Sequence, residues 1–85
     1  MRPNTHRERN ARRKLETALR ARMDTFALTD LERTRDGYVL KFSRGIVILV
    51  RRCRRSVLRD DAQLASMLTA VRRDFELVNS LRSTQ

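Results

Sequence analysis

The chain has 85 residues, of which 20 are lysine or arginine and 10 are aspartate or glutamate, so its formal net charge is +10. This length suits one small domain, near the lower limit at which a single hydrophobic core supports itself. No apolar run is long enough to cross a membrane, and the N-terminus lacks the apolar stretch of a secretory signal. We therefore expect a single small basic domain over residues 1–85, with frayed ends at 1–4 and 83–85.

The first predicted element is a helix over residues 5 to about 25. Thr5 and Glu8 have the spacing of a capping box, and Pro3 lies just before it. Apolar residues then recur every three or four positions, which is typical of an amphipathic helix. They are Ala11, Leu15, Ala18, Leu19 and Met23. The basic residues lie mostly off this stripe, so the outer surface of the helix is expected to be strongly cationic.

Three strands are predicted next, at about 28–34, 38–42 and 46–52. The two glycines, Gly37 and Gly45, fall between runs rich in β-branched and aromatic residues, where hairpin turns need a positive φ. Residues 28–31 also fit a continuation of the first helix, so the first strand has an open alternative. Together these segments predict a three-stranded antiparallel meander.

The second and third strands differ in their apolar pattern. Tyr38, Leu40 and Phe42 share one face of the second strand, which predicts one face packed on helices. The third strand is apolar on both faces from Ile46 to Val50. We therefore expect its second face to be covered by a helix, by another copy of the protein or by arginine stems.

The last predicted element is a long helix over about 61–82. Asp60 and Asp61, with Gln63 shortly after, supply a cap and favourable charge at its N-terminus. Its length of roughly 33 Å exceeds what a small sheet covers, so part of it is expected to pack on the first helix or on a second copy, giving a homodimer. Its apolar stripe, assigned to dimer or helix packing, is Leu64, Leu68, Val71, Phe75 and Val78. The predicted fold class is α+β.

Arginines follow the most apolar strand directly, and no acidic residue lies between Arg44 and Arg59. Because the strand is buried, the arginines after it are expected to form a rigid cationic ridge, which suits backbone phosphates. The predicted main contacts are Arg51, Arg52, Arg54, Arg55 and Arg59. The predicted auxiliary contacts are Arg44, Arg9, Arg12, Arg13, Lys14 and Arg20. Arginines at the end of an edge strand also serve only to prevent aggregation in many proteins, but one or two arginines are enough for that purpose.

Other reactive residues give little indication of catalysis. Cys53 is the only cysteine, so no internal disulfide is possible and a reducing compartment, cytoplasmic or nuclear, is expected. The arginines beside Cys53 favour its thiolate if it is exposed. His6 is the only histidine and has no partner for a metal site. No glycine-rich phosphate loop or nucleophile elbow is present, so we expect neither an enzyme nor a cofactor or metal.

The order helix, three antiparallel strands, helix resembles the layout of double-stranded RNA-binding domains. The resemblance implies phosphate contacts at the opening of the last helix, where this sequence has Arg54 to Asp61 in place of that family's lysine- and alanine-rich segment. The sequence predicts a nucleic-acid-binding protein, RNA rather than DNA, of the kind a virus or phage encodes as an accessory factor. The alternative is a protein interaction module, such as an adaptor, chaperone-like subunit or inhibitor, that docks on an acidic partner.

Overall fold

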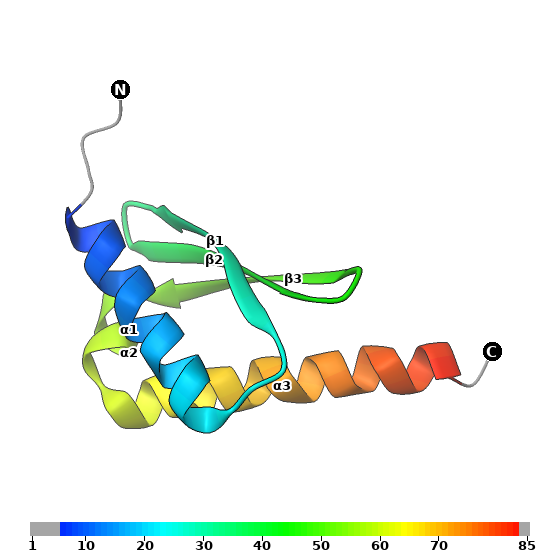
Figure 1. Cartoon of the computed structure of the whole chain (residues 1–85). Coiled ribbons are helices and arrows are strands. Elements are labelled where there is room, and N and C mark those ends of the chain that lie inside the picture. Colours follow the sequence, from blue (N-terminus) through cyan, green and yellow to red (C-terminus); the bar gives the residue numbers. More distant parts are fainter. Residues whose placement is uncertain (1–5, 84–85) are drawn as a thin grey trace.

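The computed structural model describes residues 6–83 and contains a three-stranded sheet with helices on one side (Figure 1). The chain order is α1 (His6–Arg22), β1 (Ala27–Arg33), β2 (Gly37–Arg44), β3 (Val47–Arg54), α2 (Arg55–Arg59) and α3 (Asp61–Ser83). All strand pairs are antiparallel and the spatial order is β1-β2-β3. The predicted α+β fold, with a helix, a meander and a long C-terminal helix, is confirmed. The segments predicted to fray lie outside the described residues except Ser83, which belongs to α3.

Helix α1 begins at His6, so the predicted cap by Thr5 and Pro3 lies outside the described residues. The helix ends three residues earlier than predicted, at Arg22. Met23 has a positive φ of 58°, and its N–H donates to the Arg20 carbonyl at 3.1 Å. The Asp24 N–H donates to the Leu19 carbonyl at 3.1 Å. This pair of bonds is a Schellman motif, which stops the helix and turns the chain into β1.

Strand β1 is present, so residues 28–31 do not continue the helix. One irregularity in its pairing with β2 lies between Leu28 and Asp30, where Thr29 has no partner in register. The Thr29 hydroxyl instead donates to the Lys41 carbonyl at 3.2 Å. Such a bulge bends the strand and allows Leu28 and Leu31, three residues apart, both to be buried.

The two glycines serve different purposes. Gly45 has a φ of 63°, as the predicted hairpin turn requires. Gly37 begins β2 and has no positive φ, so that part of the prediction is wrong. A Cβ on Gly37 would lie 2.0 Å from the Cys53 carbonyl oxygen. Gly37 is therefore needed because the backbone of β3 approaches it closely.

The core lies between the sheet and helices α1 and α3. The ring of Phe26 stacks on Phe75 with centroids 5.0 Å apart and meets Phe42 edge-on at 5.5 Å. Tyr38 and Leu40 are buried on the same face of β2 as Phe42, as predicted. The largest fully buried side chains are Phe42, Phe75, Leu15, Leu40, Leu68 and Val71. The core thus joins residues from both long helices and the strands of the sheet.

The outer face of β3 is open to solvent in the single chain. Ile48 is 61% exposed and Val50 is 48% exposed, and Ile46 in the preceding turn is also exposed. Within the described residues of one chain, no helix covers this face, and cover by another copy of the protein stays a prediction. The alternation along β3 is regular, so Val47 and Leu49 point inward and pack against the core.

Helix α3 begins as predicted, after a cap from Asp60. The Asp60 Oδ1 atom accepts hydrogen bonds from the N–H of Ala62 at 2.9 Å and of Gln63 at 3.2 Å. The helix has 23 residues, and its C-terminal end extends past the sheet (Figure 1). Among residues 6–83, none of the helices is long and apolar enough to cross a membrane.

Candidate nucleic-acid interface

The arginine cluster after β3 does not form one continuous ridge. Strand β3 continues to Arg54, two residues further than predicted, and side chains alternate between faces along a strand. Arg52 and Arg54 are exposed on the outer face, whereas Arg51 shares the inner side with Cys53. The chain then forms the short helix α2, which carries Arg55 and Arg59. The predicted main contacts are therefore divided among two faces of the sheet and a helix.

Arg51 is directed at helix α3. Its Nη2 atom forms a hydrogen-bonded ion pair with Asp74 Oδ2, and its Nη1 atom donates to the Val50 carbonyl at 2.8 Å. These bonds hold the end of β3 on the side of α3. Arg51 therefore has a structural partner within the chain, and a phosphate would have to compete with Asp74 for its guanidinium.

Helices α1 and α2 lie side by side, and a groove runs between them. Leu58 of α2 and Ala11 of α1 are both buried in the core, which brings the two helices together. The groove has a volume of about 360 Å³. We call it the basic groove; its lining residues are Arg7, Asn10, Ala11, Lys14, Tyr38, Arg55, Leu58 and Arg59. Four of these eight residues are cationic, two from each helix.

The cationic side chains of the basic groove are only lightly engaged. The Arg55 Nη2 atom donates to the Arg35 carbonyl at 2.7 Å, which uses one of its five donors. Lys14 Nζ lies 3.5 Å from Asp61 Oδ1, but the Asp61 side chain is almost fully exposed, so the attraction is weak and screened by salt. Arg7 and Arg59 take no part in the ion pairs found among residues 6–83.

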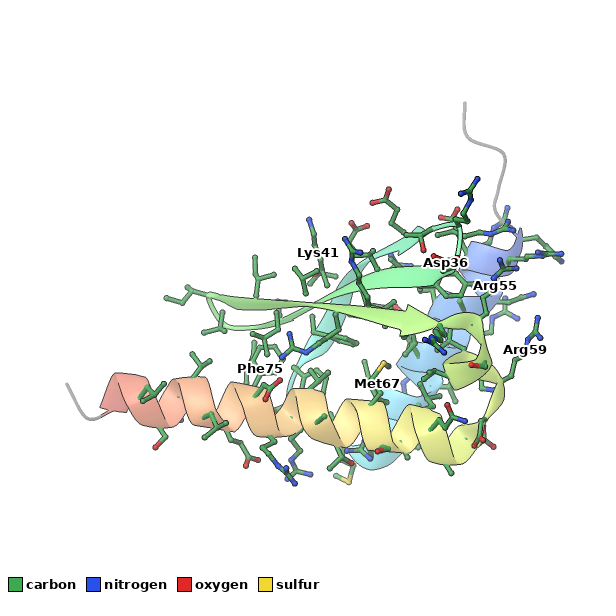
Figure 2. All side chains as sticks on the ribbon, turned by 180° about the vertical axis from the view of Figure 1, so that it is seen from behind. Asp36, Lys41, Arg55, Arg59, Met67 and Phe75 are labelled. Atoms are coloured by element: carbon green, nitrogen blue, oxygen red, sulfur yellow. The ribbon has the colours of Figure 1, made fainter. Side chains whose placement is uncertain are left out.

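A second hollow, of about 410 Å³, adjoins the basic groove at the turn between β1 and β2. Tyr38 lines both hollows, and Arg35, Arg52 and Arg54 line the second one. Figure 2 shows Arg55, Arg59 and the turn residue Asp36 at the same end of the molecule, beside the start of α1. We call this surface the basic end; its cationic residues are Arg7, Lys14, Arg35, Arg52, Arg54, Arg55 and Arg59.

Several predicted auxiliary residues lie elsewhere. Arg9, Arg13 and Arg20 are exposed on α1 but do not line the basic groove. Arg12 lies 3.9 Å from Glu16 on its own helix. Arg44 ends β2 beside the hairpin turn, at the opposite end of the strand from Gly37. Of the predicted auxiliaries, only Lys14 belongs to the basic end.

Two basic residues of this surface were missed by the sequence analysis. Arg7 lies seven residues before Lys14, two helical turns away and therefore on the same side of α1. That spacing was a signal for their common face. Arg35 lies in the turn beside Gly37, and its neighbours in space come from β3 and α2. The sequence holds no signal for that proximity.

The remaining candidates contribute no reactive group. Tyr38 is buried against the core and is unsuited to stacking on a base. Cys53 is half-buried, and burial raises the pKa of its thiol, opposite to the direction expected for an exposed cysteine among arginines. Among residues 6–83, no group of three or more histidine, cysteine, aspartate or glutamate side chains is arranged to hold a metal ion.

The apolar stripe assigned to dimer or helix packing lies inside the chain's own core. Leu64, Leu68, Val71 and Phe75 are buried, and Val78 at the far end is half-buried. For the first four residues, helix packing is the role that the structure shows.

Comparison with known proteins gave no matching protein-family model, no matching curated protein and no matching solved structure. The resemblance to double-stranded RNA-binding domains rests on the order of the elements alone.

Proposed function

We propose that this protein binds nucleic acid, RNA in preference to DNA, through the phosphates of the backbone. The observation that carries the proposal is the basic groove, where Arg7 and Lys14 of α1 face Arg55 and Arg59 of α2. Arginine presents a planar fork of donors that matches phosphate oxygens, and this fork reduces the side-chain freedom lost for each hydrogen bond formed. Arg35, Arg52 and Arg54 extend the cationic surface toward the sheet.

The basic end favours a duplex over a single strand. Proteins that bind single strands without sequence preference combine a cationic groove with aromatic side chains on which bases stack. The four aromatic residues of this chain, Phe26, Tyr38, Phe42 and Phe75, are all buried. Double-stranded RNA is recognised mainly by shape and by backbone contacts, which cationic side chains alone provide. A single half-buried cysteine suits a reducing compartment, where such a ligand occurs.

The test compares two pairs of arginines that remove the same charge. R7A/R59A removes one guanidinium from each wall of the basic groove, and neither residue has an ion-pair partner among residues 6–83. R13A/R73A removes two exposed arginines that lie outside the basic end and are likewise unpaired there. Fluorescence anisotropy with a labelled 20-base-pair RNA duplex, its single strands and the matching DNA duplex gives affinity at several salt concentrations.

We expect R7A/R59A to weaken RNA duplex binding about tenfold or more and to reduce the slope of log affinity against log salt by about 1.5, since each phosphate contact contributes roughly 0.7 to 0.9. The control pair should change affinity by less than about threefold. Equal losses in both pairs would indicate diffuse attraction and contradict a groove site. If the unmodified chain binds none of the nucleic acids, the proposal is wrong and docking on an acidic protein becomes the better function.

A further inference from the structure

Strand β3 is an open edge of the sheet. The sheet order leaves β3 with a neighbour on one side only, and the Val50 carbonyl on the free side accepts a bond from Arg51. Because successive residues of a strand direct their backbone groups to alternate sides, those of Ile48 and Arg52 also lie at the free edge. Edge strands are usually short, charged or covered, because a long apolar edge pairs with another chain. Within the described residues, the protection at the centre of β3 is the Arg51 guanidinium on the Val50 carbonyl, and this bond must give way when a second strand pairs there.

The layer beneath this edge is also apolar. The ion pair between Arg51 and Asp74 shows which side of α3 lies next to β3. Leu77 and Leu81 follow Asp74 by three and seven residues and so share that side. They are 56% and 67% exposed. Figure 2 shows β3 and α3 on the near side of the molecule, with α1 behind them. One side of the molecule therefore presents exposed apolar side chains from both its sheet and its helix layer.

We propose that β3 pairs antiparallel with β3 of a second copy of this chain, about a two-fold axis at Val50. The two sheets then form one six-stranded sheet, and the two α3 helices lie next to each other beneath it. A two-fold interface uses the same surface on both copies, and an edge strand pairs with itself in antiparallel orientation. The proposal does not depend on nucleic-acid binding, because the basic groove lies between α1 and α2; Arg52 and Arg54 of the basic end lie at the border of both surfaces.

The distribution of charge favours a second copy as the occupant. Pairing about Val50 places Ile48 opposite Arg52 of the second copy, and Ile46 opposite its Arg54. Arg52 and Arg54 of one copy thus lie at one end of the interface, and those of the other copy lie at the opposite end. Their aliphatic stems cover isoleucine side chains that are exposed in a single chain. Near the centre, Arg51 and Asp74 neutralise each other on the inner side, and Lys41, which pairs in register with Val50, lies one strand away from the axis on the outer face. A register that brought the arginines together would be opposed by repulsion between like charges.

The surface has the size of a small interface. A strand of eight residues is about 27 Å long, and a helix with its side chains is about 10 Å across. The β3 edge and the side of α3 together form a face of roughly 27 by 20 Å, about 540 Å², which is smaller than the roughly 800 Å² per partner of a typical stable interface and within the range of weaker associations. A dimer of this kind places Val50 beside Val50 of the second copy and Ile48 beside an arginine stem, which reduces the exposure of these side chains and leaves the outer face of the sheet toward solvent.

Analytical ultracentrifugation of the full chain, from about 1 to 200 µM, tests the proposal. We expect a dimer with a dissociation constant in the micromolar range or below. V50E or V50K places like charges opposite each other and should weaken the dimer at least about tenfold, and mixing the two variants should restore it because the charges are then opposite. T69E, on an exposed position of α3 away from Leu77 and Leu81, is the matched control and should dimerise normally. Circular dichroism checks the fold of each variant.

Cross-linking tests the same pairing without placing a charged side chain on β3. In a C53S background, V50C should form a disulfide between two chains, because residues at the axis have Cα atoms within bonding range. D30C lies on the same face at the opposite edge of the sheet and should not. A monomer at every concentration overturns the proposal and leaves this side for a different partner. A dimer that resists V50E and forms no V50C disulfide uses another surface, and overturns it equally.

Discussion

Arg51 of β3 and Asp74 of α3 form an ion pair that joins the edge strand of the sheet to the longest helix. The buried stripe of Leu68, Val71 and Phe75 sets the rotation of α3 about its axis, and the ion pair marks the side of the helix that lies next to β3. Leu77 and Leu81 then lie beside the free edge of the sheet, while Phe75 is directed into the core. An arginine that the sequence assigns to phosphate binding thus lies between the sheet and α3 and contacts the helix beside its open surface.

Replacing Arg51 should therefore reduce stability more than nucleic-acid binding. We expect R51A to lower the free energy of unfolding by about 1 kcal/mol, since the pair is hydrogen-bonded but partly exposed. D74A should have a similar effect, and the double variant R51A/D74A should lose little more than either, with a coupling of about 0.5 to 1 kcal/mol. Urea denaturation gives these values. R13A is the control, because Arg13 is exposed on α1 and has no ion pair among residues 6–83; strictly additive losses in the double variant would contradict the pairing.

The end of α1 is held in a conformation that costs stability. Met23 has a φ of 58° and is 85% exposed. Its left-handed backbone therefore raises the free energy of the folded state, and little side-chain packing offsets this strain. Glycine adopts this geometry without strain, and it loses part of that advantage through the flexibility of the unfolded chain. We expect Met23→Gly to raise the free energy of unfolding by about 0.5 to 1 kcal/mol, or a few degrees in melting temperature. A melting temperature below that of the unmodified chain would argue against the Schellman motif.

The order of the elements was predictable because each long segment carries its own period. Leu15 and Leu19 in α1, and Leu64 and Leu68 in α3, repeat at helical spacing, while Tyr38, Leu40 and Phe42 alternate as in a strand. These local signals survive in the fold because the same residues form the core. Helix α2 has five residues, too few for any period to appear, and it was not predicted.

Which arginines lie close together in the fold was not predictable from the sequence. A strand that ends at Arg52 and one that ends at Arg54 have the same sequence pattern, yet only the second places both Arg52 and Arg54 on the outer face. Whether Arg7 faces Arg59 depends on which helix packs beside α1, and nothing within α1 specifies its neighbour. Sequence reasoning therefore identified basic segments, and tertiary packing decided which of their residues meet.

The two glycines should respond differently to alanine. In G37A the new Cβ would lie 2.0 Å from the Cys53 carbonyl oxygen, so the backbones of β2 and β3 must separate. We expect a loss of about 2 to 3 kcal/mol in the free energy of unfolding, at the upper end for overpacking. In G45A the added atom meets nothing within 4 Å, so only the positive φ contributes, at about 1 kcal/mol. Thermal denaturation compares them; a greater loss in G45A would refute the close approach at Gly37.

The cap at Asp60 makes stability depend on pH in the acidic range. The backbone N–H of Gln63, and then that of Ala62, stabilise the charged carboxylate and lower its pKa below the ordinary value of 3.8. Because the folded state holds the proton less tightly than the unfolded state, the contribution is complete above that ordinary value. It is lost as the pH decreases through the lower pKa of the folded protein.

The stability difference between the unmodified chain and D60A should therefore be largest near neutral pH and shrink below about pH 3. Denaturant unfolding at pH 6 and pH 2.5 measures the difference, and an NMR titration of the Asp60 carboxyl carbon reports its pKa directly. D60N is the matched control, because asparagine caps a helix without a charge and should give a difference from D60A that does not change with pH. If the advantage of Asp60 over alanine were the same at both pH values, the charged carboxylate would not be the group that caps α3.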